Sequence, residues 1–206
     1  MSIGGEDCLR NLYKSNPSIT SLCNELNIKS NLGYKPKIYR EKDRKIATGT
    51  AGVKNIYLTR RLLDELEVRR DVVKAVLAHE IIHLKYKDTA SNLKRIYSLY
   101  SKEFMGIKLL HEVRANIEGY SLTGFTDDKI NEIEMYLKGV NKNKDDKKSN
   151  YDTGYPSRKQ VVAYARKYDE MSIELAEKIL LDFCHIQKIK NEKAFITKCI
   201  KKAKIT

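Results

Sequence analysis

Long apolar segments are missing from this sequence. No run approaches the roughly 18 to 20 consecutive apolar residues that a membrane-spanning helix needs. Residues 1–7 also lack the basic stretch followed by an apolar stretch that marks a secretory signal. These absences predict a soluble cytoplasmic protein without a transmembrane segment.

Cysteine is scarce and widely spaced. The cysteines lie near the two ends of the chain, and no Cys-x-x-Cys pair occurs that would indicate a structural metal site. A chain of 206 residues can bury a sizeable apolar core without disulfide bonds, which are typical of small secreted domains. We therefore expect reduced thiols at Cys8, Cys23, Cys184 and Cys199.

Acidic residues are too few to balance the basic ones. Lys and Arg number 40 against 27 Asp and Glu, which gives a formal net charge of +13. Such an excess can be an electrostatic footprint for nucleic acid or another anionic partner. Here the lysines are scattered along the chain among abundant Ile, Asn and Tyr, a profile typical of AT-rich codon usage. The charge therefore leaves a nucleic-acid partner open without requiring one.

Apolar patterning predicts one α+β domain over residues 1–206. β-branched and aromatic runs between charged or glycine-containing turns predict a small sheet, and apolar spacings of three and four from Arg60 onward predict helices. The run 141–150 is too polar to bury and predicts a mobile loop. We divide the domain into a helical N-terminal segment (1–33), a core (34–168) and C-terminal helices with a basic tail (169–206). The expected strands are 37–40, 45–48 and 56–59, and the expected helices lie within 9–13, 19–26, 62–84, 91–122 and 172–189.

One histidine pair has the spacing of a metal site. His79-Glu80-Ile81-Ile82-His83 lies in a stretch of helical periodicity, so both histidines project from one helix face with Glu80 beside them. Two imidazole nitrogens suit Zn²⁺, which in catalytic sites takes three protein ligands and a water. Glu80 is then the general base that takes a proton from the zinc-bound water as it attacks a peptide carbonyl. Two surface histidines on an ordinary helix are the alternative, but the helix is apolar nearly all round, which favours burial.

A third ligand is expected from the next helix. Glu112 lies in the helical stretch 91–122, and a helix packed across the first can bring its carboxylate to the metal. Asn116, one turn later on the same face, is then placed to hydrogen-bond a ligand histidine. His111 is the competing ligand, but the metzincin pattern puts the third histidine six residues after the second, where this chain has Thr89. We predict one Zn²⁺ per chain, held by His79, His83 and Glu112.

These residues and their surroundings resemble HtpX-like gluzincin peptidases. The likeness is carried by residues 55–66 and 75–88, and by Glu112-Val113-Arg114-Ala115-Asn116, where Asn116 replaces the Asp of the family's Glu-x-x-Ala-Asp. Because no membrane span is present, the likeness is to the soluble minimal forms called minigluzincins. The resemblance implies a zincin-like fold, with a small mixed sheet, an active-site HExxH helix and a mostly helical C-terminal part. It also implies endopeptidase activity on an extended substrate that pairs with an exposed edge strand, 55–59.

The same resemblance suggests supporting residues. Residues 154–161 resemble the family's His-Pro-Ser segment with Tyr155 in place of the His, and Tyr155 or Tyr120 is a candidate donor to the oxyanion of the transition state. Asp88 follows His83 by five residues, as in the family's His-x-x-x-x-Asp. It is a candidate for a hydrogen bond near the end of the HExxH helix, and a helix cap or a surface charge is the alternative.

The sequence therefore predicts a zinc-dependent endopeptidase that acts on an extended protein or peptide. A regulatory metallopeptidase of the ImmA/IrrE kind, which cleaves a DNA-binding repressor, shares the HExxH motif and a later Glu-x-x-Ala-Asn. The element 56–63 favours the HtpX-like interpretation. The other alternative is a non-catalytic zinc-fold module that binds nucleic acid through a basic surface, including the tail from Lys188 to Lys204.

Overall fold

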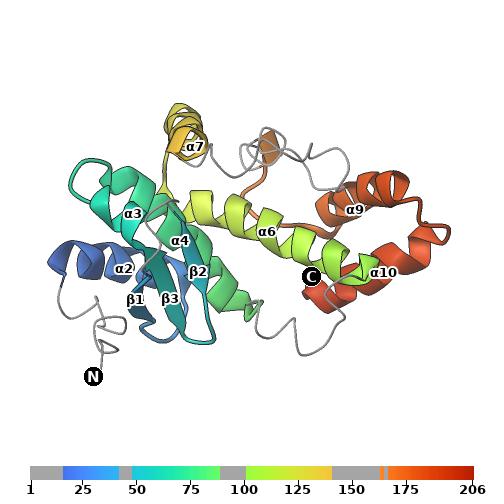
Figure 1. The fold of residues 1–206 in the computed structure, drawn as a ribbon. Helices are drawn as coiled ribbons and strands as arrows, with labels where there is room; N and C mark the ends of the chain where they lie inside the picture. The colour runs from blue at the N-terminus through green and yellow to red at the C-terminus, as the bar shows by residue number, and fades with distance from the viewer. Residues whose placement is uncertain (1–15, 42–47, 89–100, 141–162, 165–166) are drawn as a thin grey trace, which may run out of the picture.

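A computed structural model describes residues 16–41, 48–88, 101–140, 163–164 and 167–206. Within these ranges the chain has three strands and seven helices (Figure 1), which confirms the predicted α+β class. None of these helices is long and apolar enough to cross a membrane. The helix expected at 9–13, most of the strand expected at 45–48, the loop expected at 141–150 and Tyr155 lie outside the described residues.

The sheet has its last strand in the middle. β1 (Lys37–Glu41) pairs parallel to β3 (Asn55–Thr59), and β2 (Gly49–Ala51) pairs antiparallel to the other side of β3. The prediction that 55–59 is an edge strand is therefore wrong. Because a short turn folds β2 back onto β3, both sides of β3 are hydrogen-bonded, and β2 becomes an edge of the described sheet.

Three helices share one apolar cluster with the sheet. α2 (Pro17–Ser30) begins at Asn16, whose side chain accepts a hydrogen bond from the Ile19 N–H at 3.1 Å. α3 (Arg60–Asp64) follows β3 directly, and α4 (Arg70–Tyr86) packs against the sheet and α2. The buried face of the sheet contributes Ile38, Ile56 and Leu58 to this cluster.

A long helix joins the first cluster to a second one. α6 (Lys102–Thr123) crosses α4 at one end and reaches α9 (Ile173–Gln187) and α10 (Glu192–Ala203) at the other, as Figure 1 shows. Its N-terminal half buries apolar side chains against α9 and α10, whereas Tyr120 near its C-terminal end belongs to the first cluster. The single domain over residues 1–206 stays a prediction, and the shared helix is the physical connection that supports it.

α7 (Asp127–Val140) was not among the predicted helices. Its buried side chains Ile130, Ile133 and Leu137 recur at spacings of three and four and pack into the first cluster. The same apolar spacing is present in the sequence, so this helix could have been predicted from it.

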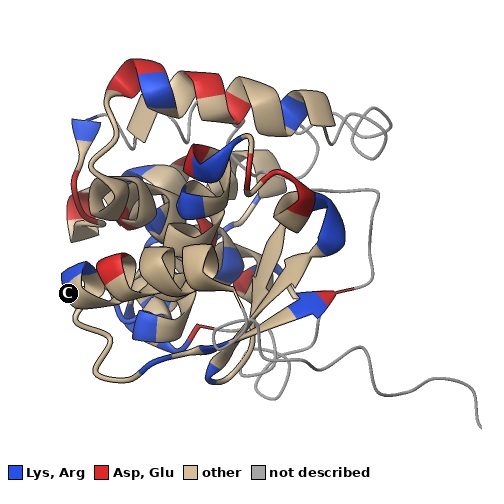
Figure 2. Cartoon of the chain, turned by 90° about the vertical axis from the view of Figure 1, so that its left-hand side faces the viewer, with Lys and Arg blue, Asp and Glu red and all other residues tan. Residues whose placement is uncertain are grey.

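The thiols and the basic tail have ordinary environments. Among the described residues, Cys23, Cys184 and Cys199 are free and buried, as expected. In the predicted basic tail, Lys198 and Lys202 of α10 each lie 2.6 Å from a carboxylate oxygen of Glu103 on α6. Figure 2 shows basic and acidic residues interspersed over the helices of that view. Part of the charge of the tail is thus neutralised within the fold.

Gly119 lies at a close approach between α4 and α6. A Cβ atom at Gly119 would lie 3.0 Å from the backbone N and 3.1 Å from the Cα of His79. These distances are tighter than nine in ten real Cβ contacts, so a side chain here would require the backbone of α4 to shift by a few tenths of an ångström. The present spacing of the two helices is therefore matched to a glycine at this position.

We predict that Gly119→Ala destabilises the protein by about 1 to 3 kcal/mol, because the added methyl group forces α4 and α6 apart. The measurement is urea unfolding followed by circular dichroism. Gly139→Ala in α7 is the matched control, since nothing lies within 4 Å of its Cβ position and alanine favours a helix by up to about 1 kcal/mol. Equal stabilisation by both substitutions would contradict the tight crossing.

Candidate metal centre

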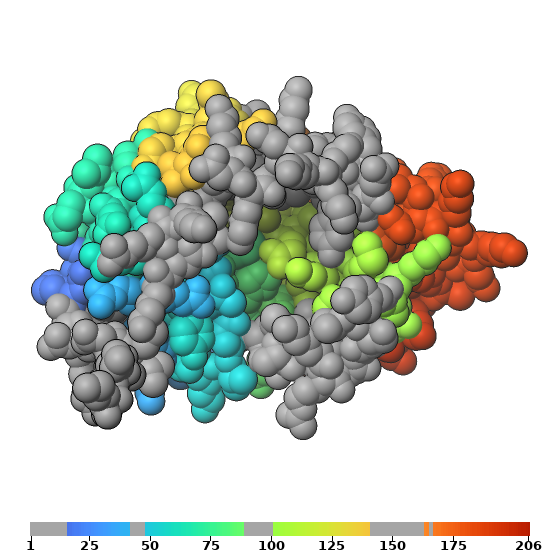
Figure 3. Space-filling view, viewed as in Figure 1, coloured from blue at the N-terminus to red at the C-terminus, as the bar shows by residue number. Residues whose placement is uncertain are grey.

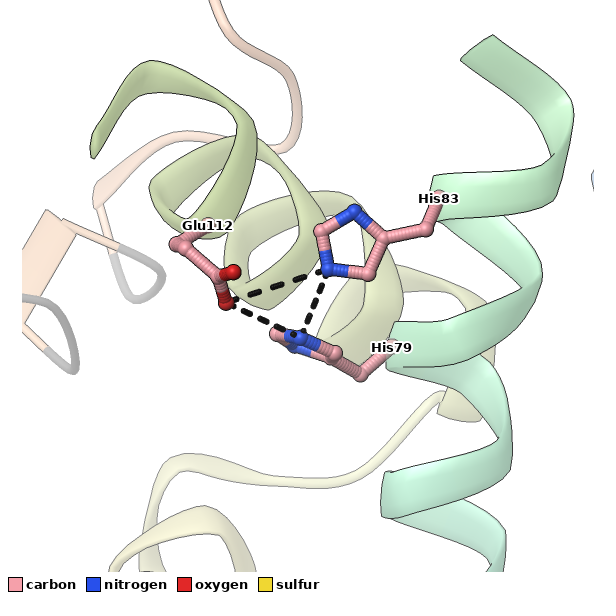
Figure 4. A group of neighbouring side chains, drawn as sticks. All are labelled: His79, His83 and Glu112. Carbon is pink, nitrogen blue, oxygen red and sulfur yellow. Dashed lines mark hydrogen bonds and ion pairs between the residues drawn. The ribbon is translucent and has the colours of Figure 1, made fainter. Parts of the chain in front are cut away.

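Three side chains from two helices converge on one point. His79 and His83 lie one turn apart on α4, and their Nε2 atoms are 3.0 Å apart. Glu112 of α6 directs its Oε2 atom between them, 3.5 Å from the Nε2 of His79 and 3.8 Å from that of His83 (Figure 4). The structure thus brings together the three residues that were predicted as ligands. This is the one such group of His, Cys, Asp or Glu found among the described residues.

The donor set fits a divalent metal. Ligand atoms at 2.0 to 2.1 Å from a tetrahedral Zn²⁺ are roughly 3.3 Å apart, and the three distances here range from 3.0 to 3.8 Å. Two imidazoles and one carboxylate are a ligand set that zinc accepts in catalytic sites, where a fourth position is left for water. The Glu112 side chain is 41% exposed, so the centre is reached from solvent.

One face of the molecule is hollowed beside the helices that carry the predicted ligands. Figure 3 shows this hollow between the blue-green strands and the yellow-green α6, with green atoms of α4 at its floor. Both histidines belong to α4 and Glu112 belongs to α6, so the elements that carry the predicted ligands border the hollow.

Opposite charges hold the ligands together in the metal-free protein. Partial desolvation would raise the pKa of Glu112, but hydrogen bonds and charge interactions with His79 and His83 lower it well below its ordinary value. Burial would lower the pKa of His83, but its interactions with Asp88 and Glu112 raise it to about 10. At neutral pH the metal-free site therefore holds an ionised Glu112 beside a protonated His83.

The turn after α4 brings Asp88 back to His83. Lys87 adopts the left-handed conformation with φ 55°, and the Asp88 N–H then donates to the His83 carbonyl at 3.1 Å. This turn places Asp88 Oδ1 at 2.9 Å from His83 Nδ1, with the Asp88 side chain only 2% exposed. Asp88 is thus a buried partner of a predicted ligand and not a surface charge.

The side chain of Glu80 extends from α4 toward the edge strand β2. Its carboxylate accepts a hydrogen bond from the Ala51 N–H, and a Cβ atom at Gly49 would lie only 2.9 Å from its Cγ. Burial raises the pKa of Glu80, and charge interactions with the neighbouring ligand histidines offset this only in part. Glycine within a strand signals close approach of another group, but the predicted strand ended at residue 48, so the sequence pattern alone did not place Gly49 in a strand.

Other predicted site residues are placed differently. Asn116 was expected to hydrogen-bond a ligand histidine, but its Nδ2 donates to the Glu112 carbonyl at 2.8 Å within its own helix. The Tyr120 hydroxyl donates to Glu134 of α7, which directs it away from the role of an oxyanion donor. His111, the competing ligand, is outside the group of three: its buried Nδ1 lies 3.8 Å from Asp88 Oδ2, and burial lowers its pKa to about 4.

Comparison with known proteins gives one match. The model of a family described as Peptidase family M48 matches residues 14–140, which is more than half of the chain. No curated protein and no solved structure matches. The match confirms the predicted HtpX-like resemblance and favours it over the ImmA/IrrE kind. It ends with α7, so α9 and α10 lie outside it.

We predict that metal affinity rises with pH between 6 and 8, by up to about tenfold per unit, because a metal must displace the proton that His83 holds below its pKa of about 10. Competition with a chelator gives the affinity, and titration calorimetry in buffers of different ionisation enthalpy gives the number of protons released. His185→Gln is the control, since this histidine on α9 is 62% exposed and should not alter the curve. A pH-independent affinity would contradict the assignment of the proton.

Proposed function

Because the chain belongs to peptidase family M48, we propose that it is a zinc-dependent endopeptidase with one Zn²⁺ per chain. The observation that carries the proposal is the convergence of His79, His83 and Glu112 beside a buried Glu80. A zinc ion held by these three ligands would supply the Lewis acidity that polarises a peptide carbonyl and eases the deprotonation of water.

Glu80 is the proposed general base. It is adjacent in sequence to a ligand histidine, and its burial raises the pKa of the carboxyl, which makes the carboxylate a stronger base. The hydrogen bond from the Ala51 N–H fixes the direction of the carboxylate. Glu80 would accept a proton from the attacking water and return it to the nitrogen of the departing amine.

Asp88 is proposed to orient His83. Its carboxylate accepts a hydrogen bond from Nδ1 of His83 at 2.9 Å, which leaves Nε2 as the nitrogen that faces His79 and Glu112. A carboxylate on the far nitrogen fixes the tautomer of a metal-binding histidine and makes it a stronger ligand. This role replaces the one expected for Asn116, whose side chain binds its own helix.

The outer edge of β2 is the proposed binding site for an extended substrate. Hydrogen bonds from Thr59 N–H to Thr48 O and from Gly52 N–H to Asn55 O bracket the β2–β3 pairing. Backbone groups alternate along an antiparallel strand, so those of Gly49 and Ala51 face away from β3. A substrate strand added there would lie beside Glu80, whose carboxylate accepts the Ala51 N–H, and would pair with the other outward backbone groups of this edge.

We predict that Glu80→Gln retains about one zinc per chain but lowers kcat/KM by about 10²- to 10⁴-fold, because the amide keeps the shape of the site and cannot accept the proton. The measurements are metal analysis of the purified protein and cleavage of a peptide library. Failure of the unmodified chain to bind zinc after reconstitution would sink the proposal. Equal cleavage by both proteins would remove Glu80 from it.

We further predict that Gly49→Ala lowers kcat by about 10- to 100-fold at unchanged zinc content, because the new Cβ displaces the Glu80 side chain without touching a ligand. Gly52→Ala in the same hairpin is the matched control, since its Cβ would meet Tyr57 at 3.3 Å and has no contact with Glu80. If both variants keep full activity, the position of Glu80 does not depend on this approach.

A further inference from the structure

A line of buried polar contacts runs from the metal centre to the end of α10. It begins with His83 Nδ1 and Asp88 Oδ1, 2.9 Å apart. The other oxygen of Asp88 accepts a hydrogen bond from Arg114 Nη2 at 2.8 Å, and Arg114 Nη1 donates to the Ala203 carbonyl at 2.9 Å. Three elements distant in sequence therefore meet at one guanidinium group: the turn after α4, the helix α6 and the last turn of α10.

The guanidinium is held in a single orientation. The side chains of Arg114 and Asp88 are each only 2% exposed, so the ion pair depends on its hydrogen bonds. Nη1 and Nη2 of Arg114 both have acceptors, whereas its buried Nε has no partner among the described residues. The Cζ atom of Arg114 lies over the Tyr86 ring, 3.9 Å from its centroid. The Tyr86 hydroxyl donates in turn to Glu118 at 2.8 Å. The ring covers one side of the guanidinium, and the two acceptors fix the directions of Nη1 and Nη2.

Only arginine has the shape for this position. Its planar fork presents two nitrogens to two different acceptors, whereas a lysine ammonium offers a single point. Ala203 is the last residue of α10, where backbone carbonyls lack partners within the helix and carry the negative end of the helix dipole. The Ala203 carbonyl thus gives the Arg114 guanidinium a second acceptor beside Asp88, whose other oxygen is bound to His83.

We propose that Arg114 is a positioning residue of the metal centre, and that the last turn of α10 is part of its support. The Ala203 carbonyl fixes Arg114, Arg114 fixes Asp88, and Asp88 fixes the tautomer and direction of His83. The inference rests on the proposed zinc site. It makes α10, which lies outside the family match, a functional part of the centre and not an appendage.

The first test is a double-mutant cycle on zinc affinity with Asp88→Asn, Arg114→Lys and the double variant. Each single substitution is expected to weaken zinc binding by about 10- to 100-fold. The double variant should be no weaker than the weaker single variant, because both act through the orientation of His83. Affinity is measured by chelator competition, and the visible absorption of the cobalt-substituted protein reports the ligand geometry.

A purely structural role for Arg114 predicts a different result. Arg114→Lys would then lower the unfolding temperature while the zinc affinity and the cobalt spectrum of the folded protein stayed unchanged. That outcome would overturn the proposal. Lysine is chosen because it keeps a positive charge beside Asp88 and so favours folding, while it cannot reach both acceptors.

The second test uses two chain lengths that differ by one residue. A chain ending at Ala203 and one ending at Lys202 both lose the packing of Ile205, but only the first keeps an acceptor oxygen for Arg114. Its terminal carboxylate would accept a charge-assisted hydrogen bond. We expect the chain ending at Ala203 to match the full chain in zinc affinity and cobalt spectrum, and the chain ending at Lys202 to match Arg114→Lys. Equal behaviour of the two shortened chains would refute the role of the carbonyl.

These outcomes separate the inference from the proposed function. If the full chain binds no zinc, the proposed function fails. If the full chain binds zinc and cleaves peptides, while the Arg114 variant and the shortened chains bind zinc equally well, only the positioning role fails.

Discussion

The metal centre depends on how closely α4 and α6 cross. His79 and His83 are neighbours by helical spacing alone, whereas Glu112 reaches them across a crossing at which the backbone of Gly119 lies close to the backbone of His79. A side chain at the crossing would hold the helices apart, and the carboxylate would lose its contact with both imidazoles. β2 approaches α4 from another direction in the same way, with Gly49 against Glu80. Gly119 and Gly49 thus allow neighbouring elements to pack closely against α4 at His79 and Glu80.

Burial gives these polar residues their properties and also makes partners obligatory. A charge removed from water is stable only when it is paired and hydrogen-bonded. Glu80 has the Ala51 N–H, and His83 has Asp88 on one nitrogen and the facing ligands near the other. The same burial shifts the pKa of Glu80 upward, toward the range in which a carboxylate can act as a base at neutral pH. The hydrogen-bond partners of Glu80 and His83 and the raised pKa of Glu80 therefore both follow from burial.

The family match and the architecture divide the chain differently. The match ends with α7, whereas α6 is shared by the apolar cluster of the sheet and the cluster of α9 and α10. A helix that is packed on both sides transmits the position of one cluster to the other, because close-packed side chains leave little room for independent movement. Arg114 lies on this helix and contacts both parts, which is why the inferred support of the centre extends to the end of α10.

Local periodicity in the sequence predicted most of the described helices and the shared face of His79 and His83, because residues three and four apart share a helix face wherever the helix lies. Glu112 was identified from its place on the next predicted helix and from the family's Glu-x-x-Ala-Asp. The strand runs 37–40 and 56–59 were legible from their β-branched and aromatic residues. Tertiary structure alone decided that β3 is the central strand and that Arg114 joins Asp88 to Ala203. Strand order and such contacts depend on which distant segments meet, and this follows from the packing of the whole chain and not from the pattern within any one segment.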